Sequence, residues 1–109
     1  MKAIVLQRSS DTKIELVALP KPVCQPNEVL IRIKAAALNH RDEWCRKGLY
    51  PNIKDGIVLG SDAAGIVEEV GASVDPKLIG QEVMLNPALH WGDNEKAQGK
   101  NFEIIGMPR

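Results

Sequence analysis

The stretch VLGSDAAGIVEEVG, residues 58–71, decides the fold because three glycines, five and six residues apart, interrupt an apolar run. A phosphate-binding Walker loop needs a lysine and a hydroxyl after its second glycine, but Ile66 and Val67 follow Gly65. A dinucleotide-binding fingerprint needs closer glycines with a helix behind them, whereas IVEEV is typical of a strand. The stretch therefore predicts glycine inside strands, where a neighbouring backbone or a ligand approaches closely.

Composition indicates one soluble globular domain. The chain has 109 residues, of which 44% are hydrophobic and 26% charged. Fourteen basic and fourteen acidic residues give a formal net charge of zero, and the scattered Lys and Arg form no basic patch for nucleic acid. No apolar run is long enough for a membrane span or a signal segment, so we expect a cytoplasmic protein with neither a membrane nor a nucleic-acid partner.

The two cysteines are expected to be free thiols. Cys24 and Cys45 are separated by a predicted strand and helix, and they form no C-x-x-C motif. Disulfides are rare in the reducing cytosol.

Short strands are predicted through most of the chain. Residues 2–6 and 14–19 flank a polar turn and predict a hairpin. The run EVLIRIKAAAL, residues 28–38, alternates apolar and polar side chains and predicts a half-buried strand. Further strands are predicted within residues 57–71, within 81–87 and from Phe102, with a long polar loop over 88–101.

One short helix is predicted in NHRDEWCRKG, residues 39–48. Asn39 is a favourable N-cap, Asp42 and Glu43 complement the dipole of the first turn, and Gly48 suits the position after the C-cap. Trp44 and Cys45 are expected to face the core. Many short strands with a single helix predict a barrel or a sandwich.

Three blocks of this sequence resemble a known family. AAALNHRDEWCRKGLYP, VLGSDAAGIVEEVGASV and IGQEVMLNP are similar, in order and spacing, to the N-terminal GroES-like catalytic domain of the medium-chain dehydrogenase/reductase superfamily. This superfamily includes the zinc-type alcohol dehydrogenases and the quinone reductases. The resemblance implies a mostly β (α+β) fold over residues 1–109, a GroES-like partly open β-barrel with one short helix. It also implies an incomplete domain, with the Rossmann nucleotide-binding domain absent from this chain.

The resemblance also shows where this chain departs from the zinc enzymes. Asn39 stands where those members have a cysteine ligand, and Ser61 stands where they have a histidine ligand. An amide and a hydroxyl do not replace thiolate and imidazole as zinc donors. The loop corresponding to the structural-zinc lobe contains no cysteine, so we expect no metal site and expect Leu89, Trp91 and Phe102 to hold this loop by packing.

The implied function is NAD(P)H-dependent reduction of an enone or a quinone by hydride transfer without zinc. In the full-length enzyme the cofactor would be NADP(H) or NAD(H). Hydrogen bonding must then stabilise the developing negative oxygen. For this role the resemblance points to Asn39, at a helix N-terminus, with Asp42 and Asp62 as acidic groups beside it.

Binding roles are implied for Asn39, for His40 at the cofactor and for Tyr50 at the substrate, and no residue is expected to bind metal. Each residue has a structural alternative: Asn39 as N-cap, Asp42 as a first-turn acid, Asp62 as a partner of a backbone amide, and Tyr50 as a loop anchor.

The partners implied are a small-molecule substrate, the protein's own C-terminal Rossmann domain and further copies in a homo-oligomer. This chain alone is expected to be inactive. The alternatives are a zinc-type alcohol dehydrogenase whose metal is held by other residues, and a GroES-like co-chaperonin module, because DGIVLG, residues 55–60, resembles the apolar tripeptide of a co-chaperonin's mobile loop.

Overall fold

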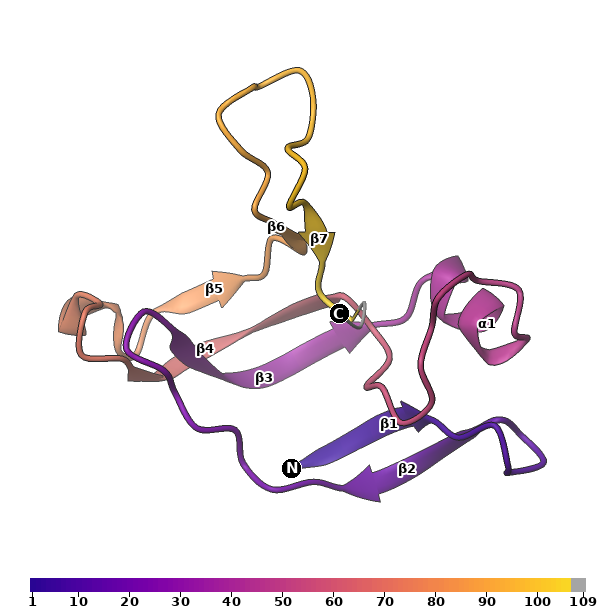
Figure 1. The fold of residues 1–109 in the computed structure, drawn as a ribbon. Coiled ribbons are helices and arrows are strands. Elements are labelled where there is room, and N and C mark those ends of the chain that lie inside the picture. The colour runs from indigo at the N-terminus through magenta and orange to yellow at the C-terminus, as the bar shows by residue number, and fades with distance from the viewer. Residues whose placement is uncertain (107–109) are drawn as a thin grey trace.

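A computed structural model describes residues 1–106, which form three small antiparallel sheets and one α-helix (Figure 1). The strands are β1 (Lys2–Leu6), β2 (Ile14–Ala18), β3 (Val29–Ala37), β4 (Asp62–Val70), β5 (Glu82–Met84), β6 (Ala88–Leu89) and β7 (Glu103–Ile104). The helix α1 spans His40–Arg46, and a 3-10 turn, η1, spans Pro76–Leu78. The predicted fold class, mostly β with one short helix in an open barrel, is confirmed.

The predicted N-terminal hairpin forms, with β1 and β2 paired from Lys2 with Ala18 to Leu6 with Ile14. Residues 56–59 run along the other edge of β1, where the Leu59 amide donates to the Ile4 carbonyl and the Leu6 amide to the Ile57 carbonyl, each at 2.9 Å. This segment is therefore bonded to a strand, unlike the free loop that the co-chaperonin alternative requires.

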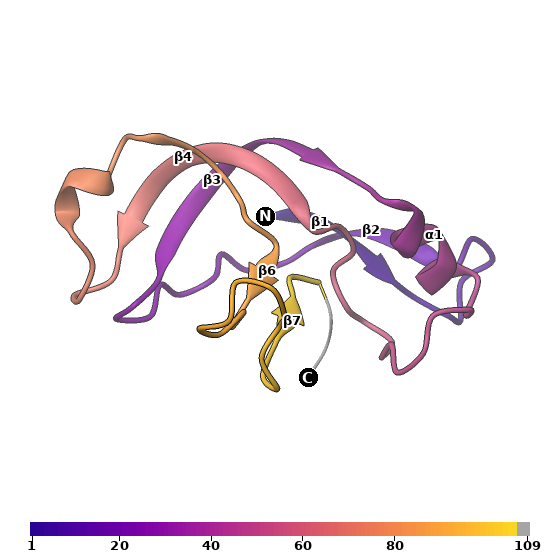
Figure 2. The same cartoon turned by 90° about the horizontal axis from the view of Figure 1, so that it is seen from above.

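The central sheet has the strand order β3-β4-β5 and curves over the hairpin (Figures 1 and 2). Its long pair, β3 with β4, contains register shifts between Leu30 and Ile31 and between Ile33 and Ala35, which are β-bulges that increase strand curvature. Gly65 lies in β4 opposite Ile33, and a Cβ built on it would overlap the Arg32 carbonyl oxygen. The prediction of glycine at a close backbone approach is confirmed at this position.

Burial along β3 differs from the sequence prediction. The alternating pattern predicted a half-buried strand, but Ile33 is 48% exposed. The reason is that this face of β3 lines a pocket and is not covered by another layer. The best buried cluster lies instead at the helix end of the molecule, where Leu6, Cys45 and Ile53 pack together.

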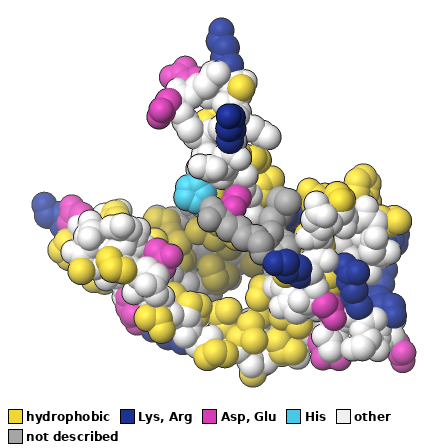
Figure 3. All heavy atoms as spheres, viewed as in Figure 1, with side chains coloured by type: hydrophobic (Ala, Val, Ile, Leu, Met, Phe, Trp, Pro, Cys, Tyr) yellow, Lys and Arg dark blue, Asp and Glu magenta, His cyan; other side chains and the backbone are white. Residues whose placement is uncertain are grey.

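The described part of the molecule is flat, with extents of 45 × 36 × 21 Å, and the long loop between β6 and β7 projects from it (Figure 1). Figure 3 shows charged side chains of both signs at the tip of this loop, and hydrophobic side chains exposed on the main body. Within residues 1–106, no helix is long and apolar enough to cross a membrane.

Candidate functional site

A buried carboxylate joins the start of α1 to the start of β4. Asp42 is 3% exposed, and its Oδ2 accepts a hydrogen bond from the Asn39 backbone amide at 2.7 Å. Its Oδ1 accepts one from the Gly60 amide at 2.9 Å. Asn39 is the N-cap of α1 as predicted, and Asp42 occupies the third helical position of a capping box. Asp42 therefore fixes the helix N-terminus against residue 60.

Sheet register brings Asn39 beside Asp62. The last residue pair of β3 and β4 is Ala37 with Asp62. Asn39 follows two residues after the end of β3 and therefore lies near the first residue of β4. The Asn39 Nδ2 donates to Asp62 Oδ2 at 2.8 Å. Asn39 is exposed, and among residues 1–106 no acceptor is bonded to the second hydrogen of this amide. The pair thus presents one oriented N–H group to solvent.

A second charged side chain, that of Arg41, contacts the residue that precedes Asp62. The Arg41 side chain is only 15% exposed, and its Nη2 donates to Ser61 Oγ at 2.5 Å and to the Ile105 carbonyl at 3.3 Å. The Ser61 hydroxyl donates to the same Ile105 carbonyl at 2.7 Å. We call this arrangement of Arg41, Ser61 and Ile105 the Arg41 bridge. The Nη1 atom of Arg41 is buried and has no hydrogen-bond acceptor within the described chain.

The remaining predicted site residues lie apart from the Asn39–Asp62 pair. Tyr50 packs on the cluster of Leu6, Cys45 and Ile53, and its ring centroid is 6.0 Å from the Arg41 guanidinium carbon. His40 is exposed and meets the Trp44 ring edge to face at a centroid distance of 5.9 Å. The structure therefore gathers Asn39, Asp42 and Asp62, and Tyr50 contacts Arg41, which precedes Asp42 in α1.

The prediction that Trp44 and Cys45 both face the core is half correct. Cys45 is buried, but Trp44 is 49% exposed. Adjacent helix positions are about 100° apart, so a helix with one layer beneath it buries only one of the two. Burial raises the pKa of the Cys45 thiol, although the nearby Arg41 charge opposes this rise. The thiol is therefore protonated and unreactive near neutral pH.

The outer face of α1 carries a separate ion-pair group. Glu43 accepts two hydrogen bonds from Arg46, at 2.6 and 2.8 Å, and lies 3.3 Å from Lys47 Nζ. The hydrogen bonds from Arg46 lower the pKa of Glu43 from 4.5 to about 2. Because the folded pKa is depressed, this pairing favours the folded helix above pH 4.5 and is lost as the pH falls toward 2.

Arg41 is the site residue that the sequence analysis did not single out. A cation in the first turn of a helix opposes the helix dipole, so its presence there requires a compensating interaction. That mismatch is visible in the sequence and is the only signal that could have identified it. Its partner Ile105 is 64 residues away in the chain, a contact that local patterns do not predict.

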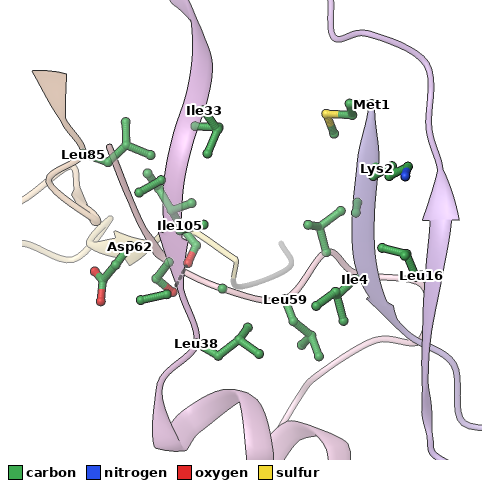
Figure 4. A pocket seen from close by; sticks show the side chains of 17 residues that line it. Met1, Lys2, Ile4, Leu16, Ile33, Leu38, Leu59, Asp62, Leu85 and Ile105 are labelled. Atoms are coloured by element: carbon green, nitrogen blue, oxygen red, sulfur yellow. Dashed lines mark hydrogen bonds between the residues drawn. The ribbon is translucent and has the colours of Figure 1, made fainter. Parts of the chain in front are cut away.

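A pocket of about 540 Å³ lies between the hairpin and the central sheet (Figure 4). Ile4, Leu16, Ile33, Leu38, Leu59 and Leu85 are among its mostly apolar lining residues. Asp62 lies at its rim with the carboxylate turned away from the hairpin, and the Ser61–Ile105 hydrogen bond closes one side. This pocket is the interior of the open barrel, and Asp62 belongs to its lining whereas Asn39 does not.

The loop that resembles the structural-zinc lobe is held by aromatic packing. The Trp91 and Phe102 rings meet edge to face at 5.5 Å, and Trp91 Nε1 donates to the Asn94 carbonyl at 2.9 Å. Leu89 and Trp91 are 38% and 41% exposed, so both are only partly buried in this loop. Across residues 1–106, no three His, Cys, Asp or Glu side chains are grouped closely enough to hold a metal ion.

Comparison with known proteins identifies the domain family. The model of the alcohol dehydrogenase GroES-like domain matches residues 25–107. A zinc-type alcohol dehydrogenase-like protein, YogA, of Leptosphaeria maculans is 38% identical over 98 residues, which are 85% of this chain and 27% of that protein. Acryloyl-coenzyme A reductase of Sulfurisphaera tokodaii is 39% identical over 85 residues, which are 77% of this chain and 25% of that protein.

The fold is also that of a solved dehydrogenase. The crystal structure of an NAD-dependent alcohol dehydrogenase superposes with a TM-score of 0.83 at 38% identity, covering 98% of this chain and 34% of that one. The chain therefore spans about a quarter to a third of the length of the proteins it matches.

Replacing Asp42 by Asn tests whether the buried carboxylate holds the turn. An amide of the same shape keeps one acceptor but turns its NH₂ group toward the other backbone donor. We expect the free energy of unfolding to fall by about 1–3 kcal/mol, because a buried donor loses its partner. Chemical denaturation and the exchange rate of the Gly60 amide measure the effect.

Asp55→Asn is the matched control, since Asp55 accepts from the Arg8 amide at 2.9 Å at an exposed position. Its expected cost is about 0.5 kcal/mol or less. Equal losses of unfolding free energy in the two variants would show that the burial of Asp42 does not explain its contribution to stability.

Proposed function

Because this chain belongs to the alcohol dehydrogenase GroES-like domain family, we propose that it is the N-terminal catalytic domain of an NAD(P)H-dependent oxidoreductase that reduces an enone or a quinone by hydride transfer without zinc. The observation that carries this proposal is the Asn39–Asp62 pair, which presents an oriented N–H donor at the position of a family metal ligand. The resemblance to a reductase of acryloyl-coenzyme A, whose name indicates an activated carbon–carbon double bond, supports the substrate class.

In this proposal Asn39 stabilises the negative oxygen of the reacting substrate. Hydride addition to the β-carbon of an enone moves the π electrons toward the carbonyl oxygen. The second hydrogen of Asn39 Nδ2 can donate to that oxygen, while Asp62 accepts the first and fixes the amide plane. Asp42 acts indirectly. Its two carboxylate oxygens accept hydrogen bonds from backbone amides, and the carboxylate thereby positions Asn39. We thus assign Asn39 to substrate and both acids to orientation.

The side chains at the two family ligand positions do not fit zinc. The Asn39 amide nitrogen is a donor to Asp62, not a lone-pair ligand. Ser61 is 8% exposed and donates to Ile105 while accepting from the Arg41 guanidinium at 2.5 Å, so a positive charge already lies beside it. Zinc prefers thiolate, imidazole or carboxylate donors, and a neighbouring cation opposes a second one. No step of the proposed mechanism therefore involves a metal.

A nicotinamide cofactor, NADP(H) or NAD(H), would supply the hydride when bound. Exposed His40 is the residue of this chain that we assign to it, because its ring lies beside Trp44 on the outer side of α1. For Tyr50 we propose indirect support of the site, since it packs beneath Arg41.

We further propose that other parts of a longer protein complete this domain. The walls of the 540 Å³ pocket are mostly apolar, and the outer edge of β3 has no backbone partner among residues 1–106. Exposed apolar walls and the open outer edge of a nine-residue strand favour covering by further chain. The expected partners are a C-terminal Rossmann domain and, through remaining sheet edges, further copies in a homo-oligomer.

The function is tested with the longer protein purified without a chelator. With NADPH or NADH, we expect reduction of simple enones or quinones, unchanged after dialysis against a chelator, because no step uses a metal. Cofactor absorbance measures turnover, and elemental analysis measures bound zinc. Near-stoichiometric zinc together with chelator-sensitive oxidation of alcohols would establish the alternative, a zinc-type alcohol dehydrogenase.

Asn39→Ala removes the proposed donor. We expect kcat for the active substrate to fall about 10- to 100-fold with little change in the KM for the cofactor, since the lost hydrogen bond forms with the developing oxyanion. Steady-state kinetics measure both constants. Asn101→Ala, in the exposed loop, is the control and should leave kcat unchanged; an equally unaffected Asn39→Ala enzyme would remove Asn39 from the mechanism.

The 109-residue chain by itself should bind NADPH negligibly and show no turnover. It carries no dinucleotide-binding fingerprint between a strand and a helix. Titration followed by cofactor fluorescence measures binding. Tight binding to the isolated chain would contradict the assignment of the cofactor site to another domain.

A further inference from the structure

We propose that Arg41 is the positioning residue of the Asn39–Asp62 pair: its guanidinium fastens the Ser61 turn and the Ile105 segment to the first turn of α1, and so fixes the separation of the two paired side chains. This inference deepens the proposed function and rests on it for the enzymatic part of its test. Its structural part depends only on the contacts of the Arg41 bridge.

The position of Arg41 calls for a specific role. Its charge lies in the first helical turn, where the helix dipole disfavours a cation, and its side chain is 15% exposed. Burying a charge is costly unless hydrogen bonds compensate for lost water. Asp42 Oδ1 is 3.9 Å from Arg41 Nη2, which provides a counter-charge but not a close hydrogen bond. The bonds from Nη2 to Ser61 and Ile105 supply part of the compensation, while Nη1 has no acceptor within the described chain.

Arg41 and Asp42 act on the same turn from consecutive positions. Asp42 accepts the Gly60 amide at 2.9 Å, and Arg41 donates to the next residue, Ser61, at 2.5 Å. Two adjacent helix residues thus hold two adjacent turn residues. Asp62 follows directly, so these two contacts fix the backbone from which its carboxylate reaches Asn39. Arg41 therefore controls the geometry of the pair without touching it.

The Arg41 bridge also binds a segment that is distant in the sequence. Ser61 Oγ and Arg41 Nη2 both donate to the Ile105 carbonyl, at 2.7 and 3.3 Å. The next residue, Gly106, has φ +84°, and a Cβ built there would lie 2.7 Å from the Gly60 carbonyl oxygen and 3.0 Å from Arg41 Nη2. Only glycine allows this approach. The segment after β7 is therefore packed against the turn that carries Ser61.

The test compares Arg41→Met and Arg41→Lys with Arg8→Met. Arg8 is a matched control because its Nη2 donates to the Ile53 carbonyl at 2.7 Å in a part-buried contact away from the Asn39–Asp62 pair. In the 109-residue chain, NMR follows the Asn39 side-chain NH₂ resonances and the exchange of the Gly60 amide. Loss of positioning should shift the Asn39 resonances and speed Gly60 exchange at least tenfold in Arg41→Met. Arg8→Met should change neither.

Arg41→Lys separates charge from geometry. Lysine keeps the charge but lacks the planar guanidinium that reaches two acceptors at once, so we expect intermediate shifts. It is also the variant to measure if Arg41→Met does not fold. In the active longer enzyme, kcat should fall about tenfold or more in Arg41→Met, less in Arg41→Lys and not in Arg8→Met. The KM for the cofactor should stay within about twofold.

The outcomes distinguish this proposal from the proposed function. Unchanged Asn39 resonances and unchanged Gly60 exchange in folded Arg41→Met or Arg41→Lys protein would overturn the positioning role, even with lower overall stability. The expected NMR changes, combined with a longer protein that reduces no enone or quinone, would support Arg41 as the positioning residue and reject the proposed reaction.

Discussion

The structure of the site depends on one buried carboxylate with two backbone donors. Asp42 satisfies the Asn39 amide, which the helix leaves without an intrahelical partner, and the Gly60 amide, which the β4 strand has not yet taken into its ladder. A buried carboxylate is tolerated only with such partners. Asp42 therefore couples helix and sheet directly. Asn39, Ser61 and Asp62 acquire their relative positions from that coupling.

Hydrogen bonds hold the shape of this arrangement, as the proposed zinc-independent function requires. A metal fixes its ligands by short bonds to one centre. Here two neighbouring helix residues of opposite charge, Arg41 and Asp42, hold a turn through separate bonds to Ser61 and Gly60. The two charges lie in the first turn of α1, so in the proposed function little side-chain freedom would be left to lose on substrate binding. Their directional bonds leave the Asn39 amide as the free donor.

Much of the fold was predictable from sequence because its determinants are local. The hairpin, the helix with Asn39 as N-cap, and glycine within β4 follow from residue preferences and spacing. The family resemblance pointed to Asp42 and Asp62 as candidate residues, and the structure places both beside Asn39. Burial was not predictable in the same way. The alternating pattern of β3 correctly indicated a strand, but such a pattern does not reveal whether another layer of structure covers Ile33. The exposed Trp44 shows the same limit, since helix periodicity does not reveal how many layers surround the helix.

The Arg41 bridge was not predictable because its partners are a hydroxyl 20 residues away and a carbonyl 64 residues away. Such contacts depend on the register between β3 and β4 and on the return of the chain after β7. Both are long-range properties, and the glycines mark where they are needed. Gly65 allows β3 and β4 to approach closely, and Gly106 allows the backbone to lie against Gly60 and Arg41. The hydrogen bonds that hold the candidate site lie at the helix end of the molecule, next to the buried cluster of Leu6, Cys45 and Ile53. The site can therefore stay ordered although the apolar interior of the open barrel is partly uncovered.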